Sequence, residues 1–130
     1  MKLLTTHFIS LILLTASIAH AEWPMSNDPA FDATVRKPMY PKSEGPRVLL
    51  DGAHHNFFVQ WDFIEPFSDL AKADGYRPVI GDETFTPGYL AKFDIVVIIK
   101  ALPVDFTTKT EVTTETTFTD AEIAALHDWV

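Results

Sequence analysis

Residues 47–58 read RVLLDGAHHNFF, a short apolar strand that runs directly into a polar turn. A strand that ends in Asp-Gly and is followed by a helical pattern is typical of the first βα unit of an open α/β sheet. In such sheets, ligands bind beyond the carboxyl ends of the strands. We therefore expect the four polar side chains of the turn to line a ligand-binding site. These are Asp51, His54, His55 and Asn56.

The composition is that of one small globular domain. The chain has 130 residues, of which 47% are hydrophobic and 12% aromatic. Its formal net charge of −8 argues against nucleic acid or an anionic membrane surface as the main partner. Because the sequence has no cysteine, it excludes disulfides, thiolate metal sites and a cysteine nucleophile within these residues.

Residues 1–21 have the features of a cleavable secretory signal peptide. A basic start at Lys2 precedes an apolar run over residues 8–19, and Ala19-His20-Ala21 supplies an A-x-A cleavage site. The run is shorter than the roughly 20 apolar residues that span a bilayer. We expect export to the periplasm or beyond, with no stable membrane anchor. An uncleaved anchor or a buried helix is the alternative.

Residues 22–46 form a proline-rich lead-in to the domain. They hold five of the nine prolines, and proline biases both itself and its predecessor towards extended conformations. We expect an extended segment, either a mobile linker or one pinned across the domain by apolar side chains. The candidates for pinning are Phe31, Val35, Met39 and Tyr40.

From residue 47 onward, strand and helix patterns alternate. The predicted helices start near Glu65, at Thr86-Pro87 and at the capping box Thr119-Asp120-Ala121-Glu122. The apolar stripe of the last helix is Ile123, Leu126 and Val130. Strands are predicted over 47–50, 76–80 and 94–99, and a threonine-rich loop over 107–117.

The two later strands have different expected places in the sheet. Pro78 cannot donate a ladder hydrogen bond, so strand 76–80 suits an edge. Strand 94–99 contains five consecutive β-branched residues, a pattern typical of a central parallel strand that is buried on both faces. Together with the right-handed crossover rule, this predicts a three-layer α/β domain over residues 47–130 with a parallel sheet of order 2-1-3.

Two motifs add a family resemblance over most of residues 31–130. Asp51-x-x-His54-His55-Asn56-Phe57 and Phe118-Thr119-x-x-Glu122-Ile123 resemble the DUF4350 family. Its members look like class I glutamine-amidotransferase-like domains with a flavodoxin-like sheet. No reaction is established for the family, so the resemblance implies no catalytic residue.

The chain departs from the family pattern at two places. Gly52 stands where many relatives carry an acidic residue, which weakens the case for a metal at the turn. The Gly-Gly turn and apolar strand that follow in the family are absent. This implies an incomplete sheet and an N-terminal fragment of a longer protein, and we expect residues 22–130 alone to fold poorly.

Three interpretations of the turn remain open. In the first, it binds a small anionic or sugar-like ligand or a protein partner. In the second, the protein is a hydrolase-type enzyme in which Asp51 activates a histidine as general base, or Asp51 and His54 bind a divalent metal. In the third, Asp51 and Asn56 make turn hydrogen bonds and the histidines are half-buried spacers. No particular metal, cofactor or oligomeric state is indicated.

The leader generates a first testable prediction. Signal peptidase is expected to cleave between Ala21 and Glu22, because small residues stand at positions 19 and 21 behind the apolar run. Intact-mass analysis of the protein recovered from the exported fraction checks the cleavage site. Recovery of chains that retain Met1 in a membrane fraction would contradict it.

Overall fold

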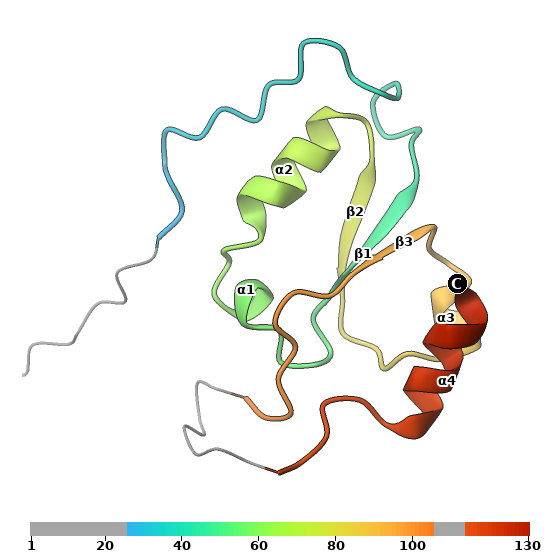
Figure 1. The fold of residues 1–130 in the computed structure, drawn as a ribbon. Helices are drawn as coiled ribbons and strands as arrows, with labels where there is room; N and C mark the ends of the chain where they lie inside the picture. The colour runs from blue at the N-terminus through green and yellow to red at the C-terminus, as the bar shows by residue number, and fades with distance from the viewer. Residues whose placement is uncertain (1–25, 106–113) are drawn as a thin grey trace, which may run out of the picture.

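The structure is a computed structural model that describes residues 26–105 and 114–130. The predicted leader and part of the threonine-rich loop, residues 106–113, lie outside the described residues. The elements in chain order are β1 (Arg47–Asp51), α1 (Phe57–Gln60), α2 (Glu65–Ala73), β2 (Arg77–Gly81), α3 (Pro87–Leu90), β3 (Ile95–Val97) and α4 (Asp120–Trp129) (Figure 1).

The predicted sheet is confirmed. The three strands are parallel and lie in the order β2-β1-β3, with Leu49 of β1 opposite Val79 on one side and Val96 on the other. Pro78 lies on β2 at an edge of this sheet, as its missing N–H predicts.

Helices cover both faces of the sheet, so the described part has three layers. Figure 1 shows α1 and α2 on one side of the strands and α3 and α4 on the other. Successive residues of a strand point to opposite faces, and β1 therefore contributes to two separate cores. The core towards α3 and α4 contains Leu49, Phe85, Tyr89, Leu90, Phe93 and Ala125. The core towards α1 and α2 contains Val48, Leu50 and Ile64.

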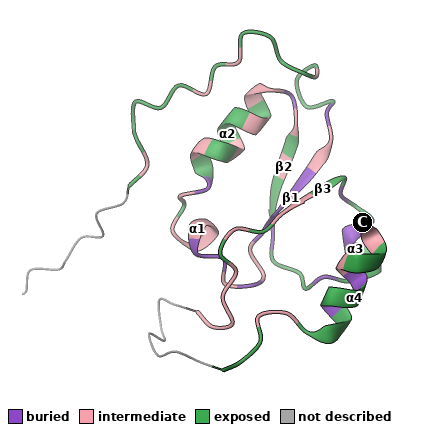
Figure 2. Ribbon diagram, in the orientation of Figure 1, coloured by how far each residue is buried: buried purple, intermediate pink, exposed green. Residues whose placement is uncertain are grey.

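The place of β3 agrees with the prediction of an incomplete sheet, whereas the predicted burial of strand 94–99 on both faces is not observed, because no residue of β3 is buried in the described part (Figure 2). There β3 is only three residues long, pairs with β1 alone and forms the second edge of the sheet. Ile95 is 37% exposed and Ile98 is 40% exposed. The apolar composition of the segment is therefore not matched by burial.

The helix predicted near Glu65 is confirmed, whereas α1 was not predicted. Helix α2 carries proline in its first turn and Lys72 in its last, both favourable positions. The four residues of α1 are too few to show a helical period in the sequence. None of the helices in the described ranges is long and apolar enough to cross a membrane.

The capping box at the start of α4 is also confirmed. The Glu122 N–H donates to Thr119 Oγ1 at 3.3 Å, and the Thr119 N–H donates to Glu122 Oε2 at 2.9 Å. These two bonds satisfy backbone donors that the first turn of a helix otherwise leaves unpaired.

The predicted apolar stripe of α4 is wrong for two of its three residues. Ile123 is 54% exposed and Val130 is 99% exposed, whereas Leu126 packs against the core. The helix buries Glu122 and Ala125 instead. The buried carboxylate of Glu122 has polar partners inside the domain, and this contact turns the helix away from the orientation that its apolar residues suggest.

The lead-in is fastened to the domain at its carboxyl end. The ring of Tyr40 packs edge-on against Tyr76 with centroids 5.1 Å apart, and the Tyr40 N–H donates to Asp74 O at 3.2 Å. Phe31 and Met39 are 44% and 69% exposed and do not pin the segment. Of the four candidate residues, Tyr40 makes the anchoring contact.

The turn after α2 generates a stability prediction. Gly75 has a φ of 91°, and a Cβ added there would lie 2.3 Å from Tyr40 O. Gly75→Ala is therefore expected to destabilise the domain by at least about 2 kcal/mol, from left-handed strain and the backbone clash. The change in unfolding midpoint in urea measures the effect.

Gly88→Ala is the matched control. A Cβ at Gly88 would meet nothing within 4 Å, and this residue lies inside α3. The substitution is expected to leave stability unchanged or to raise it by up to about 1 kcal/mol, because alanine favours the helix. Equal destabilisation by both variants would show that the tight contact at Gly75 is not what matters.

Candidate functional site

His54 lies between two carboxylates at the carboxyl end of β1. Its Nδ1 is 2.8 Å from Asp51 Oδ1, and its Nε2 is 2.8 Å from Glu122 Oε1. All three side chains are buried: Asp51 is 1% exposed, His54 5% and Glu122 6%. The arrangement joins the first strand to a helix 68 residues further along the chain.

The turn after β1 positions Asp51 and His54. Asp51 is the last residue of the strand, and its Oδ1 also accepts a bond from the Ala53 N–H at 3.2 Å. The Gly52 N–H donates to Gly81 O at 2.8 Å, which ties the turn to the end of β2. Because the backbone turns at once, the His54 ring folds back over the strand end, within reach of Asp51.

The capping box positions the carboxylate of Glu122, the third side chain of this buried group. One carboxylate oxygen of Glu122, Oε2, accepts bonds from the Thr119 N–H and hydroxyl. The other, Oε1, faces His54 and also accepts a bond from the Phe85 N–H at 3.2 Å. Both oxygens are therefore used, and the carboxylate has little freedom to move.

Two aromatic rings enclose the imidazole. The centroids of the Phe85 and Phe118 rings lie 4.7 Å and 4.5 Å from that of His54. The two phenyl rings are themselves nearly parallel, at 14° and 6.0 Å. They keep water from the His54 contacts, and hydrogen bonds in such surroundings are stronger than those exposed to solvent.

The charges in this group shift its pKa values in opposite directions. Burial acts to lower the pKa of His54, but hydrogen bonds and charge from Asp51 and Glu122 outweigh it and raise that pKa above 6.5. Burial acts to raise the pKa of Glu122, but hydrogen bonds from Thr119, His54 and Phe85 lower it from 4.5 to about 2. The geometry therefore favours an imidazolium held between carboxylates.

This arrangement leaves His54 no free nitrogen for proton transfer or metal binding. Each ring nitrogen already faces a carboxylate oxygen, and the side chain is 5% exposed. A general base needs one nitrogen within reach of the substrate. Among residues 26–105 and 114–130, no group of three or more acidic or histidine side chains is placed to hold a metal ion.

Asn56 brings unpaired polar atoms to the same turn. It is 1% exposed, and within the described part of the chain neither its Oδ1 nor its Nδ2 has a hydrogen-bond partner. The second oxygen of Asp51, Oδ2, is also buried without a partner there. Buried polar groups are nearly always paired, so these three atoms have unused hydrogen-bonding capacity that a ligand could take up.

His55 does not join the buried group. Its φ is 44°, in the left-handed region, and its side chain is only partly buried. Adjacent residues of the turn point in different directions, so only His54 of the two histidines faces the carboxylates. The structure thus brings together Asp51 and His54, and separates His55 from them.

The loop after β3 lies against the same turn. The Leu102 N–H donates to His54 O at 2.8 Å, and the Phe57 N–H donates to Lys100 O at 3.4 Å. Two loops that follow neighbouring parallel strands therefore meet at the carboxyl end of the sheet. This is the place where the fold class predicts a ligand.

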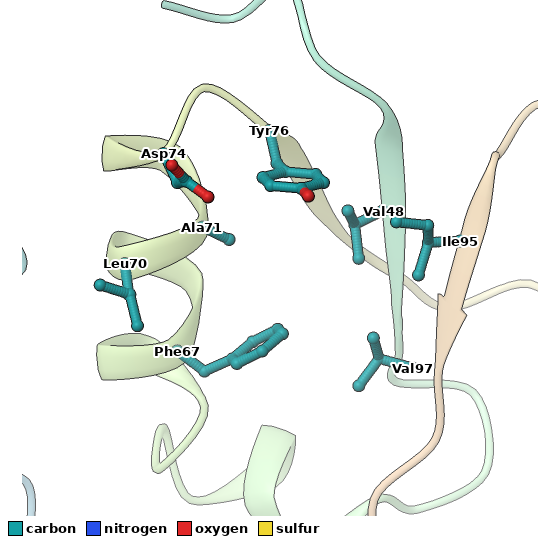
Figure 3. Close-up of a pocket in the computed structure, with 8 residues that line it drawn as sticks. All are labelled: Val48, Phe67, Leu70, Ala71, Asp74, Tyr76, Ile95 and Val97. Carbon is teal, nitrogen blue, oxygen red and sulfur yellow. The ribbon is translucent and has the colours of Figure 1, made fainter. Parts of the chain in front are cut away.

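A separate apolar groove lies between α2 and the sheet. Figure 3 shows Phe67 and Leu70 of α2 on one side of it and Ile95 and Val97 of β3 on the other, with Val48 between them. Its volume is about 280 Å³. None of the four polar residues predicted for the site lines this groove.

The sequence interpretation missed Glu122 as a member of the site. Glu122 was identified only as part of a capping box, a local role that it also has. The signal that could have found it is the motif Phe118-Thr119-x-x-Glu122, which places an aromatic ring and a buried carboxylate beside the same helix start. No comparable motif around Phe85 marks it as part of this site.

Comparisons with protein-family models, with curated proteins and with solved structures found no match to this chain. The resemblance to the DUF4350 family therefore stays a prediction.

The carboxylate pair generates a prediction about pH. His54 has a raised pKa, so its contribution to stability is complete below pH 6.5 and is lost as the pH rises through that raised value. Glu122 has a lowered pKa, so its contribution is complete above pH 4.5 and is lost as the pH falls towards about 2. Urea unfolding midpoints measured against pH should be highest between about pH 4.5 and 6.5.

Glu122→Gln tests the assignment directly. The neutral amide removes one of the two charges facing His54 and one acceptor of the capping box, at an expected cost of about 1–3 kcal/mol near neutral pH. It should also reduce the fall of the urea unfolding midpoint at acid pH. Asp120→Asn, an exposed change in the same helical turn, should cost at most about 1 kcal/mol and leave the fall of the unfolding midpoint at acid pH unchanged. Identical curves for both variants would disprove the role of Glu122.

Proposed function

We propose that the protein is an exported α/β domain that binds a small, neutral, polar ligand at the carboxyl end of β1. Asp51 and Asn56 make the contacts to the ligand, and His54 holds the turn in place. Export rests on the leader features of residues 1–21. DUF4350 membership belongs to the same proposal and rests on the two sequence motifs.

The observation that carries the binding proposal is the side chain of Asn56, which is buried and has no hydrogen-bond partner among the described residues. A carboxamide offers two donors and one acceptor with two lone pairs. Leaving such a group buried without partners costs about 1–3 kcal/mol. A chain that keeps this cost in its unliganded form is understandable when a ligand supplies the missing hydrogen bonds.

The charge of the turn selects the class of ligand. Asp51 Oδ2 is a buried acceptor with no partner among the described residues. An anionic ligand placed beside it would meet a like charge in surroundings of low dielectric constant, where repulsion is strong. Hydroxyl or amide groups can donate to Asp51 and both donate to and accept from Asn56. A sugar-like or amide-bearing molecule therefore fits better than an anionic one.

The hydrolase alternative has less support. An acid-base or metal-binding role for His54 requires that its contact with Asp51 or Glu122 open, because both nitrogens are occupied. The enclosure by Phe85 and Phe118 opposes such opening. His54 therefore supports binding as a positioning residue.

Asn56→Leu separates a ligand-binding role from a structural one. If Asn56 is unpaired in the free protein, an apolar side chain of similar size should raise the free energy of unfolding by about 1–2 kcal/mol. If Asn56 supports the turn through hydrogen bonds, the same change should lower it. Chemical denaturation of both proteins without added ligand measures the sign.

The same variant tests binding. Glucose, acetamide and acetate are added separately at high concentration, and the melting temperature is recorded. Wild type should be stabilised by glucose or acetamide and not by acetate, because only a bound species raises the melting temperature by mass action. Asn56→Leu should lose this response. A response to acetate alone, or an equal response in the variant, would overturn the proposal.

A further inference from the structure

We propose that the ligand of this turn is a carbohydrate, and that Gln60 binds it together with Asn56 while aromatic rings around α1 pack against its apolar face. Both points rest on the proposed function, because they concern the same site. The observation that carries them is a second buried carboxamide oxygen. Gln60 Oε1, like the polar atoms of Asn56, has no hydrogen-bond partner among the described residues.

Gln60 lies one helical turn after Asn56. The Gln60 N–H donates to Asn56 O at 2.9 Å, and residues four apart in a helix are neighbours on its surface. The two carboxamides therefore leave the helix on the same side. Gln60 Nε2 donates to Asp105 Oδ1 at 3.3 Å, in the loop that follows β3. Gln60 thus lies where two loops meet at the carboxyl end of the sheet.

The unpaired atoms of this turn are mostly acceptors. Asp51 Oδ2, Asn56 Oδ1 and Gln60 Oε1 are buried oxygens without a partner in the described part of the chain, and Asn56 Nδ2 is a donor in the same position. Three oxygens need three donated hydrogens, whereas a simple amide such as acetamide carries two. Each hydroxyl of a sugar both donates and accepts, so a ring with several hydroxyls can satisfy all of these atoms.

The charges around the turn favour a neutral ligand. Lys100 Nζ lies 4.3 Å from the centroid of the Phe57 ring, so its ammonium is close to the residue that follows Asn56. This ammonium would repel a cationic ligand at Asn56, and Asp51 would repel an anionic one. A neutral sugar meets neither repulsion.

Aromatic rings surround the same helix. The ring of Phe57 packs in a cluster with three others, whose centroids lie 5.7, 6.3 and 6.0 Å from its own: Phe58, Trp61 and Phe63. Phe57 is buried, whereas the other three are only partly buried. A sugar has an apolar face of C–H groups beside its hydroxyls, and partly exposed rings next to carboxamides can contact both. Trp61 directly follows Gln60 and therefore serves as a reporter of this contact.

The ligand reaches these atoms by displacing the loop that follows β3. Residues 101–105 of this loop are only partly buried. Two hydrogen bonds between the loop and α1 are long, at 3.4 Å from the Phe57 N–H to Lys100 O and 3.3 Å from Gln60 to Asp105, and bonds of this length are weak. A sugar hydroxyl can replace Asp105 as the partner of Gln60 Nε2, so this nitrogen stays paired when the loop moves.

Tryptophan fluorescence of the full chain tests the carbohydrate class. Trp23→Phe and Trp129→Phe together leave Trp61 as the one tryptophan. Its emission is recorded against D-glucose, D-galactose, N-acetyl-D-glucosamine and maltose, with D-sorbitol as a control that has hydroxyls but no ring. At least one sugar should shift the emission to shorter wavelength in a saturable manner, because binding removes water from the indole. Sorbitol should cause no such shift.

Gln60→Met tests the further binding residue. Methionine has a similar size and no carboxamide, so the change should weaken sugar binding by roughly tenfold, the effect of about one hydrogen bond. Gln60→Asn keeps a carboxamide but withdraws it by one methylene, and it should also weaken binding. Lys72→Met, an exposed change on α2, is the matched control and should leave the affinity unchanged. Circular dichroism establishes that each variant is folded before its titration.

The outcomes distinguish the carbohydrate and Gln60 from the proposed function. Sugar binding that Asn56→Leu abolishes and Gln60→Met leaves unchanged overturns the role of Gln60 alone. Stabilisation of wild type by acetamide, without a saturable response to any of the four sugars, overturns the carbohydrate class alone. An equal response to sorbitol overturns the contact with the aromatic rings. No response to any sugar or to acetamide overturns both proposals.

Discussion

His54 lies between Asp51 and Glu122, and the contact between the end of β1 and the start of α4 depends on it. A buried charge is tolerated only when it is paired and hydrogen-bonded, so each of these groups requires the others. Glu122 in turn holds the start of α4 and the Phe85 N–H. One imidazole thereby connects the end of β1, the segment before α3 and the helix that covers them.

The same constraint explains which parts of the structure the sequence could predict. Signals that act within a few residues were read correctly: the strand before Asp51, the proline at the start of α2 and the capping box at Thr119. The parallel order β2-β1-β3 also followed, because crossover handedness leaves few arrangements open. These features depend on backbone geometry and local hydrogen bonds, which the sequence shows directly.

What could not be predicted depends on contacts between distant residues. The capping box predicts only the local role of Glu122, whereas its carboxylate also turns inward to His54, and this orientation leaves Ile123 facing solvent. Composition alone indicated that β3 is buried on both faces, since a β-branched segment has the same pattern whether its neighbour is another strand or solvent.

The sequence separation of the His54–Glu122 contact has a consequence for the order of folding. The two residues are 68 positions apart, so the acceptor for His54 leaves the ribosome after all three strands have been made. Contacts of long range form late and slow the folding of small domains. Until Glu122 is in place, one nitrogen of His54 lacks the carboxylate that it faces in the folded domain. We therefore expect α4 to pack late in folding, after the three strands have formed.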